Sequence, residues 1–147
     1  MKELGELVRP YLESSPYWHR VEQMDQATYE VLIEAVRERI VCLVDVVKEV
    51  ETFLAPPQYD ADTLSKLEKP EVRGMLKGFL EHLPEQLDLE QARTFMKGLP
   101  KALQLPAKQV YMPIRLGLTG SPQGPELPYL LVVMGVPEVR QRLGRFI

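Results

Sequence analysis

The placement of thirteen prolines in 147 residues is the feature that most constrains the fold of this chain. Between them, apolar residues recur with the three- and four-residue spacing of a helix face, and strand-like alternation is hard to find. The first such set is Leu4, Leu7, Val8, Tyr11 and Leu12. Because proline lacks the amide donor that a helix interior needs, prolines at element boundaries favour many short helices. The sequence therefore predicts an irregular all-α protein.

Start signals divide the first two thirds of the chain into successive helices. Asp25 and Asp88 are predicted N-caps, since an aspartate side chain accepts a hydrogen bond from an otherwise unpaired amide of the first turn. A short helix is expected to begin at Asp62 or Thr63. Pro70 suits the first turn of the next helix, where its missing amide proton costs nothing.

Stop signals are clearer toward the C-terminus. Pro113 is predicted to begin a short helix that Gly120 ends, because glycine readily takes the left-handed conformation found after a helix. Two further helices are expected over residues 128–134 and 137–146, with Gly135 between them.

Charge divides the chain into two parts of opposite sign. The whole chain carries −3, yet residues 1–90 hold 10 Lys and Arg against 19 Asp and Glu, whereas residues 91–147 hold 8 against 2. A positive region suggests that one end faces a polyanion, because phosphate binding depends on local potential. The alternative is that the two parts attract each other within the molecule. With Leu83-Pro84, the change of sign predicts two packed helical subdomains, an acidic one over 1–86 and a basic one over 87–147.

Several kinds of site are not expected. The apolar runs stay well short of the ~20 residues that span a bilayer, and no signal-peptide pattern is visible, so a cytoplasmic location is predicted. His19 and His82 show no ligand spacing with the single cysteine, Cys42, which we expect to be a buried structural thiol. We therefore predict no metal and no cofactor.

The most specific pattern in the chain lies between Met112 and Leu127. It reads M-P-I-R-L-G-L-T-G-S-P-Q-G-P-E-L, and a Met-Gly and an Arg-Leu pair follow. This pattern resembles the C-terminal signature of bacterial glutamyl-tRNA synthetases, M-x-P-[LI]-R-x-A-L-T-G followed by x-x-x-x-P-x-L. Weaker matches over residues 4–12 and 36–43 extend the resemblance along the whole chain. Gly117 stands where the family usually has alanine.

The resemblance implies a helical anticodon-binding region made of two subdomains, and hence tRNA as the partner. Arg115 would approach the anticodon, where a guanidinium pairs with a base edge or a phosphate. The alternative is an arginine that holds the two subdomains together. Gly124, Pro125 and Leu127 would place a loop and a helix start against the bases. Leu127 is equally well explained as a core leucine.

Four other cations are candidates for tRNA contacts. The resemblance places a base-discriminating residue near Arg37 and Arg39, but residues two apart lie on different helix faces, so at most one of them is expected to face a given ligand. Each is otherwise a surface arginine. Arg142 and Lys108 are possible phosphate contacts, and a structural pairing accounts equally well for Arg142.

The catalytic motifs of the synthetases are missing from these 147 residues. No segment like His-Ile-Gly-His or Lys-Met-Ser-Lys-Ser occurs. The chain is therefore predicted to be no enzyme by itself and to have no catalytic residues, whether it works with a separate synthetase catalytic chain or within a longer glutamate-tRNA ligase. Neither DNA nor membrane is an expected partner. The alternative function is a non-catalytic interaction or regulatory protein that kept the fold but lost tRNA binding, as its acidic part suggests.

Overall fold

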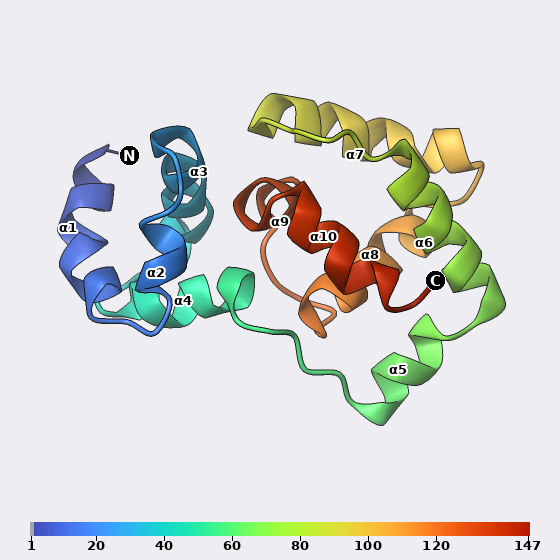
Figure 1. The fold of residues 1–147 in the computed structure, drawn as a ribbon, viewed down its shortest axis with the longest axis horizontal. Coiled ribbons are helices and arrows are strands. Elements are labelled where there is room, and N and C mark those ends of the chain that lie inside the picture. The colour runs from blue at the N-terminus through green and yellow to red at the C-terminus, as the bar shows by residue number, and fades with distance from the viewer. Residues whose placement is uncertain (1) are drawn as a thin grey trace. The chain divides into compact units, whose positions relative to one another are not determined.

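Residues 2–147 are described by the computed structural model, except for the side chain of Lys2. In this part of the chain every regular element is a helix, ten of them α-helices and one a 3₁₀-helix, as Figure 1 shows. The prediction of an irregular all-α fold is confirmed. None of these helices is both long enough and apolar enough to cross a membrane. Two compact units follow each other, the first ending at Ala55 and the second running from Pro56 to Ile147.

The first unit is built around α1 (Lys2–Glu13), which packs against α3 (Gln26–Val36) and α4 (Asp45–Leu54). Between them lie the single-turn α2 (Trp18–Val21) and η1 (Arg37–Arg39). Asp25 caps α3 as predicted, with its Oδ1 accepting from the Thr28 amide at 2.7 Å. The core of the unit consists of aliphatic residues from these helices together with Phe53: Val8, Leu12, Leu32, Ile33, Val46 and Val50 are all fully buried.

The expectation that Cys42 is buried is wrong. Cys42 lies exposed in the loop between η1 and α4, beside Val41, which is 93% exposed. The Asp45 side chain accepts hydrogen bonds from the amides of Val41, at 3.1 Å, and Cys42, at 2.9 Å. These bonds hold the backbone in a turn before α4. The apolar residues Val41 and Cys42 therefore do not continue the buried face of a helix.

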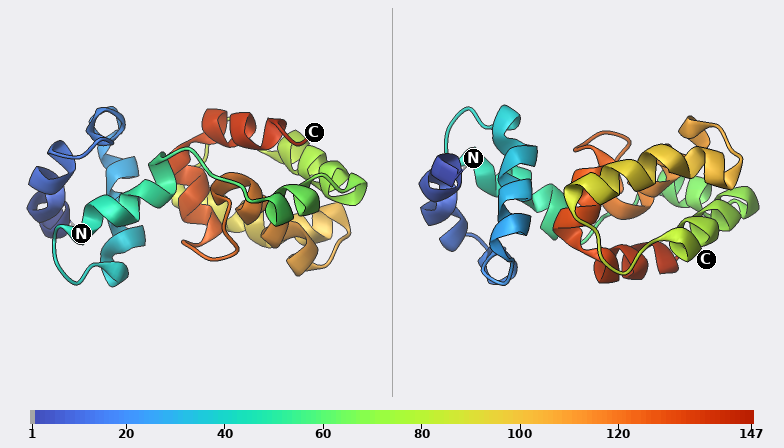
Figure 2. Two further views of the ribbon diagram at one scale, coloured as in Figure 1. Left: turned by 90° about the horizontal axis from the view of Figure 1, so that it is seen from below. Right: turned by 90° about the horizontal axis from the view of Figure 1, so that it is seen from above.

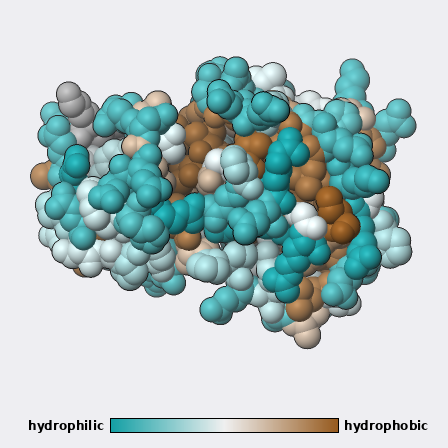
Figure 3. Space-filling model, in the orientation of Figure 1, coloured by the Kyte–Doolittle hydropathy of each residue, from teal (hydrophilic) through white to brown (hydrophobic). Residues whose placement is uncertain are grey.

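The second unit contains six helices, which can be followed in both views of Figure 2. They are α5 (Ala61–Leu67), α6 (Pro70–His82), α7 (Leu89–Leu103), α8 (Ala107–Thr119), α9 (Leu127–Met134) and α10 (Val136–Gly144). Helix α8 contacts α5, α6, α7 and α10, and α7 packs along α9. The fully buried Ile114 and Leu118 put α8 at the centre of this core. On the face drawn in Figure 3, apolar surface of this unit is bordered by hydrophilic side chains.

The division between compact units differs from the predicted subdomain boundary. Residues 86 and 87 lie between α6 and α7, inside the second unit. Arg140 of α10 donates to the carbonyls of Leu80, at 3.2 Å, and Leu83, at 2.9 Å, and so ties α10 to the end of α6. The compact units divide instead at Pro56. The assignment of binding subdomains to 1–86 and 87–147 remains a prediction.

Two predicted helix starts are wrong. Helix α5 begins at Ala61, because Asp60 and not Asp62 or Thr63 caps it, accepting from the Thr63 amide at 2.7 Å. Helix α8 begins at Ala107, with Pro113 in its interior. Pro113 cannot donate to the carbonyl four residues earlier, but the burial of Val110 and Ile114 on either side holds the helix together across that gap.

The predicted end of α8 at Gly120 is confirmed. Gly120 has a φ of +75°, and a Cβ at this position would lie 2.1 Å from the backbone oxygen of Gln58. Only glycine combines this backbone conformation with so close an approach of another segment. The helix therefore stops here, and the chain turns into the loop that precedes α9.

Candidate nucleic-acid interface

Arg115 and the loop after α8 are brought into direct contact. The guanidinium Nη1 of Arg115 donates to the carbonyl oxygen of Pro125, ten positions along the chain. The loop is further held by Thr119, whose Oγ1 donates to the Arg115 carbonyl at 2.9 Å and accepts from the Ser121 amide at 3.2 Å. Arg115 on α8 therefore holds the loop that contains Gly124 and Pro125 through the Pro125 carbonyl.

A surface pocket of about 310 Å³ opens beside this loop. Its lining comes from α7, α8 and the start of α9, and includes Arg115, Leu127, Arg93, Lys97 and Tyr111. The Leu127 side chain is 5% exposed, so most of it serves the core and only an edge reaches the pocket. The structure thus brings Arg115 and Leu127 to one pocket, and their contact with an anticodon stays a prediction.

The walls of the pocket are held by aromatic hydroxyls and a cation. Tyr111 donates from its hydroxyl to the Met96 carbonyl at 2.5 Å. Arg93 lies 5.6 Å from the centre of the Tyr129 ring and donates to the Tyr129 hydroxyl at 3.1 Å. These contacts hold the Arg93 guanidinium at the Tyr129 ring, so one wall of the pocket is cationic.

The lining of the pocket carries more positive than negative charge. Arg93, Lys97 and Arg115 are its cations, and Glu126 is its one carboxylate. Arg93 also lies 3.9 Å from the exposed Glu90, an ion pair that solvent screens. Sequence reasoning missed Arg93 and Lys97. Their spacing of four on a predicted helix was the signal available, since it puts both on one face.

Arg142 does not line this pocket. Its side chain is 6% exposed, its Nη1 donates to the Leu118 carbonyl at 2.7 Å, and its Nη2 pairs with Glu138 Oε1 at 3.0 Å. That carbonyl belongs to the last turn of α8, where helix acceptors have no intrahelical partner. The geometry favours the structural alternative for Arg142 over a phosphate contact.

Lys108, Arg37 and Arg39 are the other cations predicted to contact tRNA. Lys108 is exposed in the first turn of α8 and lines a different cavity. Arg37 and Arg39 lie on η1 of the first unit, both exposed, and Arg39 Nη1 approaches Glu49 Oε2 at 4.0 Å. No group of three or more His, Cys, Asp or Glu side chains suited to a metal ion occurs within residues 2–147.

Comparisons with known proteins match nearly the whole chain. The family model described as "Anticodon binding domain" matches residues 3–147. A glutamate–tRNA ligase of Carboxydothermus hydrogenoformans is 30% identical over 149 residues, which cover 97% of this chain and 31% of that protein. The glutamate–tRNA ligase of Bacillus licheniformis is 29% identical over 152 residues, covering 100% and 31%. The chain thus spans about a third of the length of these curated relatives.

Solved structures show the same fold. The crystal structure of a glutamate tRNA ligase from Elizabethkingia meningosepticum, in complex with its amino acid, aligns over 96% of this chain and 28% of its own, with a TM-score of 0.73 and 22% identity. Glutamate-tRNA synthetase from Elizabethkingia anophelis aligns over 97% and 28%, with a TM-score of 0.74 and 22% identity. At this level of identity the likeness establishes the helical architecture.

Proposed function

Because this chain belongs to the anticodon-binding domain family, we propose that it binds the anticodon loop of glutamate tRNA through the pocket beside Arg115. The observation that carries the proposal is that Arg115, which holds the Pro125 loop, also lines a pocket with three cations. The glutamate-tRNA ligases among its relatives support the choice of tRNA.

The pocket suits a single-stranded loop of RNA. Unstacked bases are recognised by stacking on aromatic rings or guanidinium planes and by hydrogen bonds to their exposed edges. Arg93 offers such a plane, held over Tyr129, and the guanidinium of Arg115 offers a fork of donors. Lys97 adds a charge for the phosphates. Arg37 or Arg39 would supply a second base contact from the first unit.

We propose that the ligase reaction is carried out by residues outside these 147. The chain holds no nucleotide-binding motif, and we propose that a catalytic region, in a longer protein or a separate chain, activates glutamate. The site of action would be the cytoplasm, where tRNA is charged. The alternative, an interaction protein without tRNA binding, is favoured by the acidic composition of the first unit, 6 Lys and Arg against 11 Asp and Glu in residues 1–55.

Filter binding at fixed salt tests the proposal with three RNAs: glutamate tRNA, the same tRNA with a changed anticodon, and an unrelated tRNA. We expect Arg115→Ala to weaken binding of glutamate tRNA by about 10- to 100-fold, the usual effect of losing a base-edge contact. Arg73→Ala, which removes an exposed arginine of α6 outside the pocket, is the matched control. Equal weak binding to all three RNAs, unchanged by Arg115→Ala, would support the interaction protein instead.

A further inference from the structure

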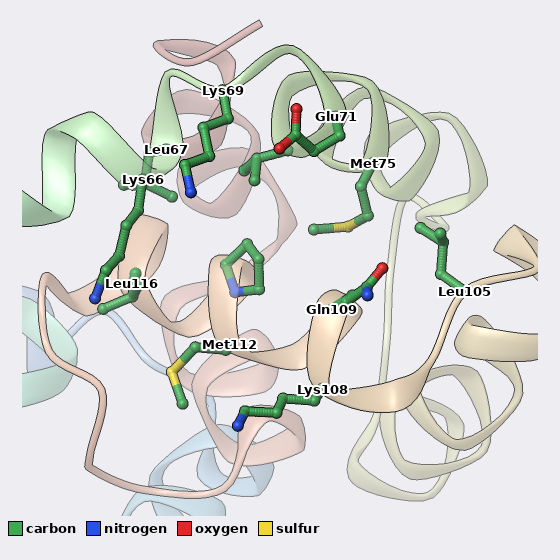
Figure 4. A pocket seen from close by; sticks show the side chains of 12 residues that line it. Lys66, Leu67, Lys69, Glu71, Met75, Leu105, Lys108, Gln109, Met112 and Leu116 are labelled. Carbon is green, nitrogen blue, oxygen red and sulfur yellow. The ribbon is translucent and has the colours of Figure 1, made fainter.

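A second cavity, of about 440 Å³, lies between α5, α6 and α8, and we call it the α5–α6–α8 groove. Figure 4 shows it from close by. Its floor is apolar and includes Leu67, Val72, Met75, Met112 and Leu116. Val72 and Met112 are partly exposed, so the floor offers accessible apolar surface and is not a sealed part of the core.

Three lysines border this groove. Lys66, Lys69 and Lys108 are all exposed, and in Figure 4 their amino groups lie around the end of the groove where Met112 and Leu116 are found. Two carboxylates are near them. Glu71 lines the groove, and Asp62 pairs with Lys66 at 3.2 Å, in an ion pair whose side chains are 57% and 79% exposed. Such a pair is weak, because water screens it, so Lys66 exchanges partners at little cost.

The groove and the Arg115 pocket have no lining residue in common. Both use α8, but Lys108, Met112 and Leu116 face the groove, whereas Tyr111 and Arg115 face the pocket. A ligand can therefore occupy one without displacing a ligand from the other side of the helix. Lys108, which does not line the Arg115 pocket, lines this groove.

We propose that the α5–α6–α8 groove docks an acidic amphipathic helix of a protein partner. The partner's apolar side chains would cover the floor, and its carboxylates would meet Lys66, Lys69 and Lys108. Lysine suits this role because its ammonium pairs with a carboxylate without demanding one orientation. Two methionines in the floor add flexible side chains that adapt to varied apolar partners, as in other grooves that take amphipathic helices.

The lining favours a peptide over a nucleic acid. Single-stranded nucleic acids are bound mainly by stacking on aromatic rings or on arginine planes. The residues of the groove include neither an aromatic residue nor an arginine. Three ammonium groups alone would hold phosphates, but the apolar floor between them would then stay uncovered.

Titration with model peptides, followed by NMR of ¹³C-labelled methionine methyl groups, tests the proposal on the full chain. The probe is a helix-length peptide with leucine at positions i, i+3, i+4 and i+7 and glutamate elsewhere. We expect the methyl signals of Met75 and Met112 to shift, while those of Met24 and Met134, which do not line the groove, stay in place. A scrambled peptide of the same composition should bind more weakly, because its leucines no longer share one face.

Charge reversal supplies the matched variants. The triple variant Lys66→Glu, Lys69→Glu and Lys108→Glu should bind the peptide at least about tenfold more weakly, the combined effect of three exposed ion pairs. The control, Lys48→Glu, Lys77→Glu and Lys101→Glu, changes the net charge equally at exposed positions outside the groove. Equal weakening in both variants, or shifts at methionines away from the groove, would overturn the proposal. So would a uridine oligonucleotide that shifts Met75 and Met112 and displaces the peptide. No tRNA is used, so failure here leaves the anticodon proposal standing.

Discussion

Arg115 and Pro125 are joined by a hydrogen bond from the guanidinium of the arginine to the carbonyl oxygen of the proline. One side chain thus holds the loop that leads into α9 and also lines the pocket beside it. The loop and the pocket lining are therefore coupled at this residue, and a change of Arg115 alters both.

Replacing Arg115 with lysine should separate charge from geometry. Arg115→Lys keeps the positive charge but loses the planar fork, so we expect binding of glutamate tRNA to weaken by about tenfold and discrimination against a changed anticodon to fall. The dependence of binding on salt should stay the same, because the charge near the phosphates is kept. Filter binding across a salt series measures both quantities. Undiminished discrimination would show that Arg115 acts only as a charge.

We expect Arg142 to stabilise the fold and not to contact tRNA. Arg142→Ala leaves the Leu118 carbonyl and the Glu138 carboxylate without this partner, so we expect the free energy of unfolding to fall by about 2 kcal/mol in urea denaturation. Lys101→Ala, at an exposed position of α7, should change it by less than about 0.5 kcal/mol. Unchanged stability together with weaker tRNA binding would instead make Arg142 a phosphate contact.

Replacing two helical glycines with alanine should change the stability of the protein in opposite directions. A Cβ at Gly117 of α8 would lie 2.4 Å from Leu143 Cδ2, whereas a Cβ at Gly98 of α7 would meet nothing within 4 Å. Gly98→Ala should stabilise the protein by up to about 1 kcal/mol through helix propensity. Gly117→Ala gains the same propensity but must move Leu143 in a filled core, and we expect a net loss of about 1 kcal/mol. Thermal or urea unfolding of both variants checks the signs, and stabilisation by Gly117→Ala would show that α10 shifts freely.

Stability should fall in acid because of three aspartates at helix starts. Hydrogen bonds from backbone amides lower the pKa of all three carboxyl groups. The Thr28 amide lowers the pKa of Asp25, and the Thr63 amide lowers that of Asp60. The amides of Cys42 and, to a smaller extent, Val41 lower the pKa of Asp45. Since the folded pKa lies below the unfolded value, each carboxylate contributes stability above about pH 4 that is lost as the pH falls through the lowered pKa. Urea midpoints measured from about pH 5 down to about pH 2 should therefore decrease.

The triple variant Asp25→Asn, Asp45→Asn and Asp60→Asn is the control for this pH dependence. Asparagine accepts the same amide hydrogen bonds but carries no charge at any of these pH values. Its urea midpoints should depend less on pH below about pH 4 than those of the unmodified protein. An identical slope in both proteins would place the acid sensitivity in other carboxyl groups.

Local signals predicted the elements best where one residue decides the outcome. The caps at Asp25 and Asp88 and the end of α8 at Gly120 are confirmed, because a single side chain or a positive φ determines each. Pro113 was assigned to a helix start for the same kind of local reason, and there the prediction is wrong. Burial of Val110 and Ile114 on either side outweighs one missing hydrogen bond, and that burial depends on helices far along the chain.

The amino-acid sequence by itself determined that this chain is a set of short helices and that residues 112–127 carry its family signature, because periodicity, caps and motifs are local properties of the chain. Only the tertiary structure decided which charged side chains line a surface cavity and which are paired inside the core. It added Arg93 and Lys97 to the pocket of Arg115, placed Lys108 on the α5–α6–α8 groove, and turned Arg142 inward to Leu118 and Glu138. The reason is physical: an arginine's role depends on the acceptors within its reach, and those acceptors come from segments that folding brings together.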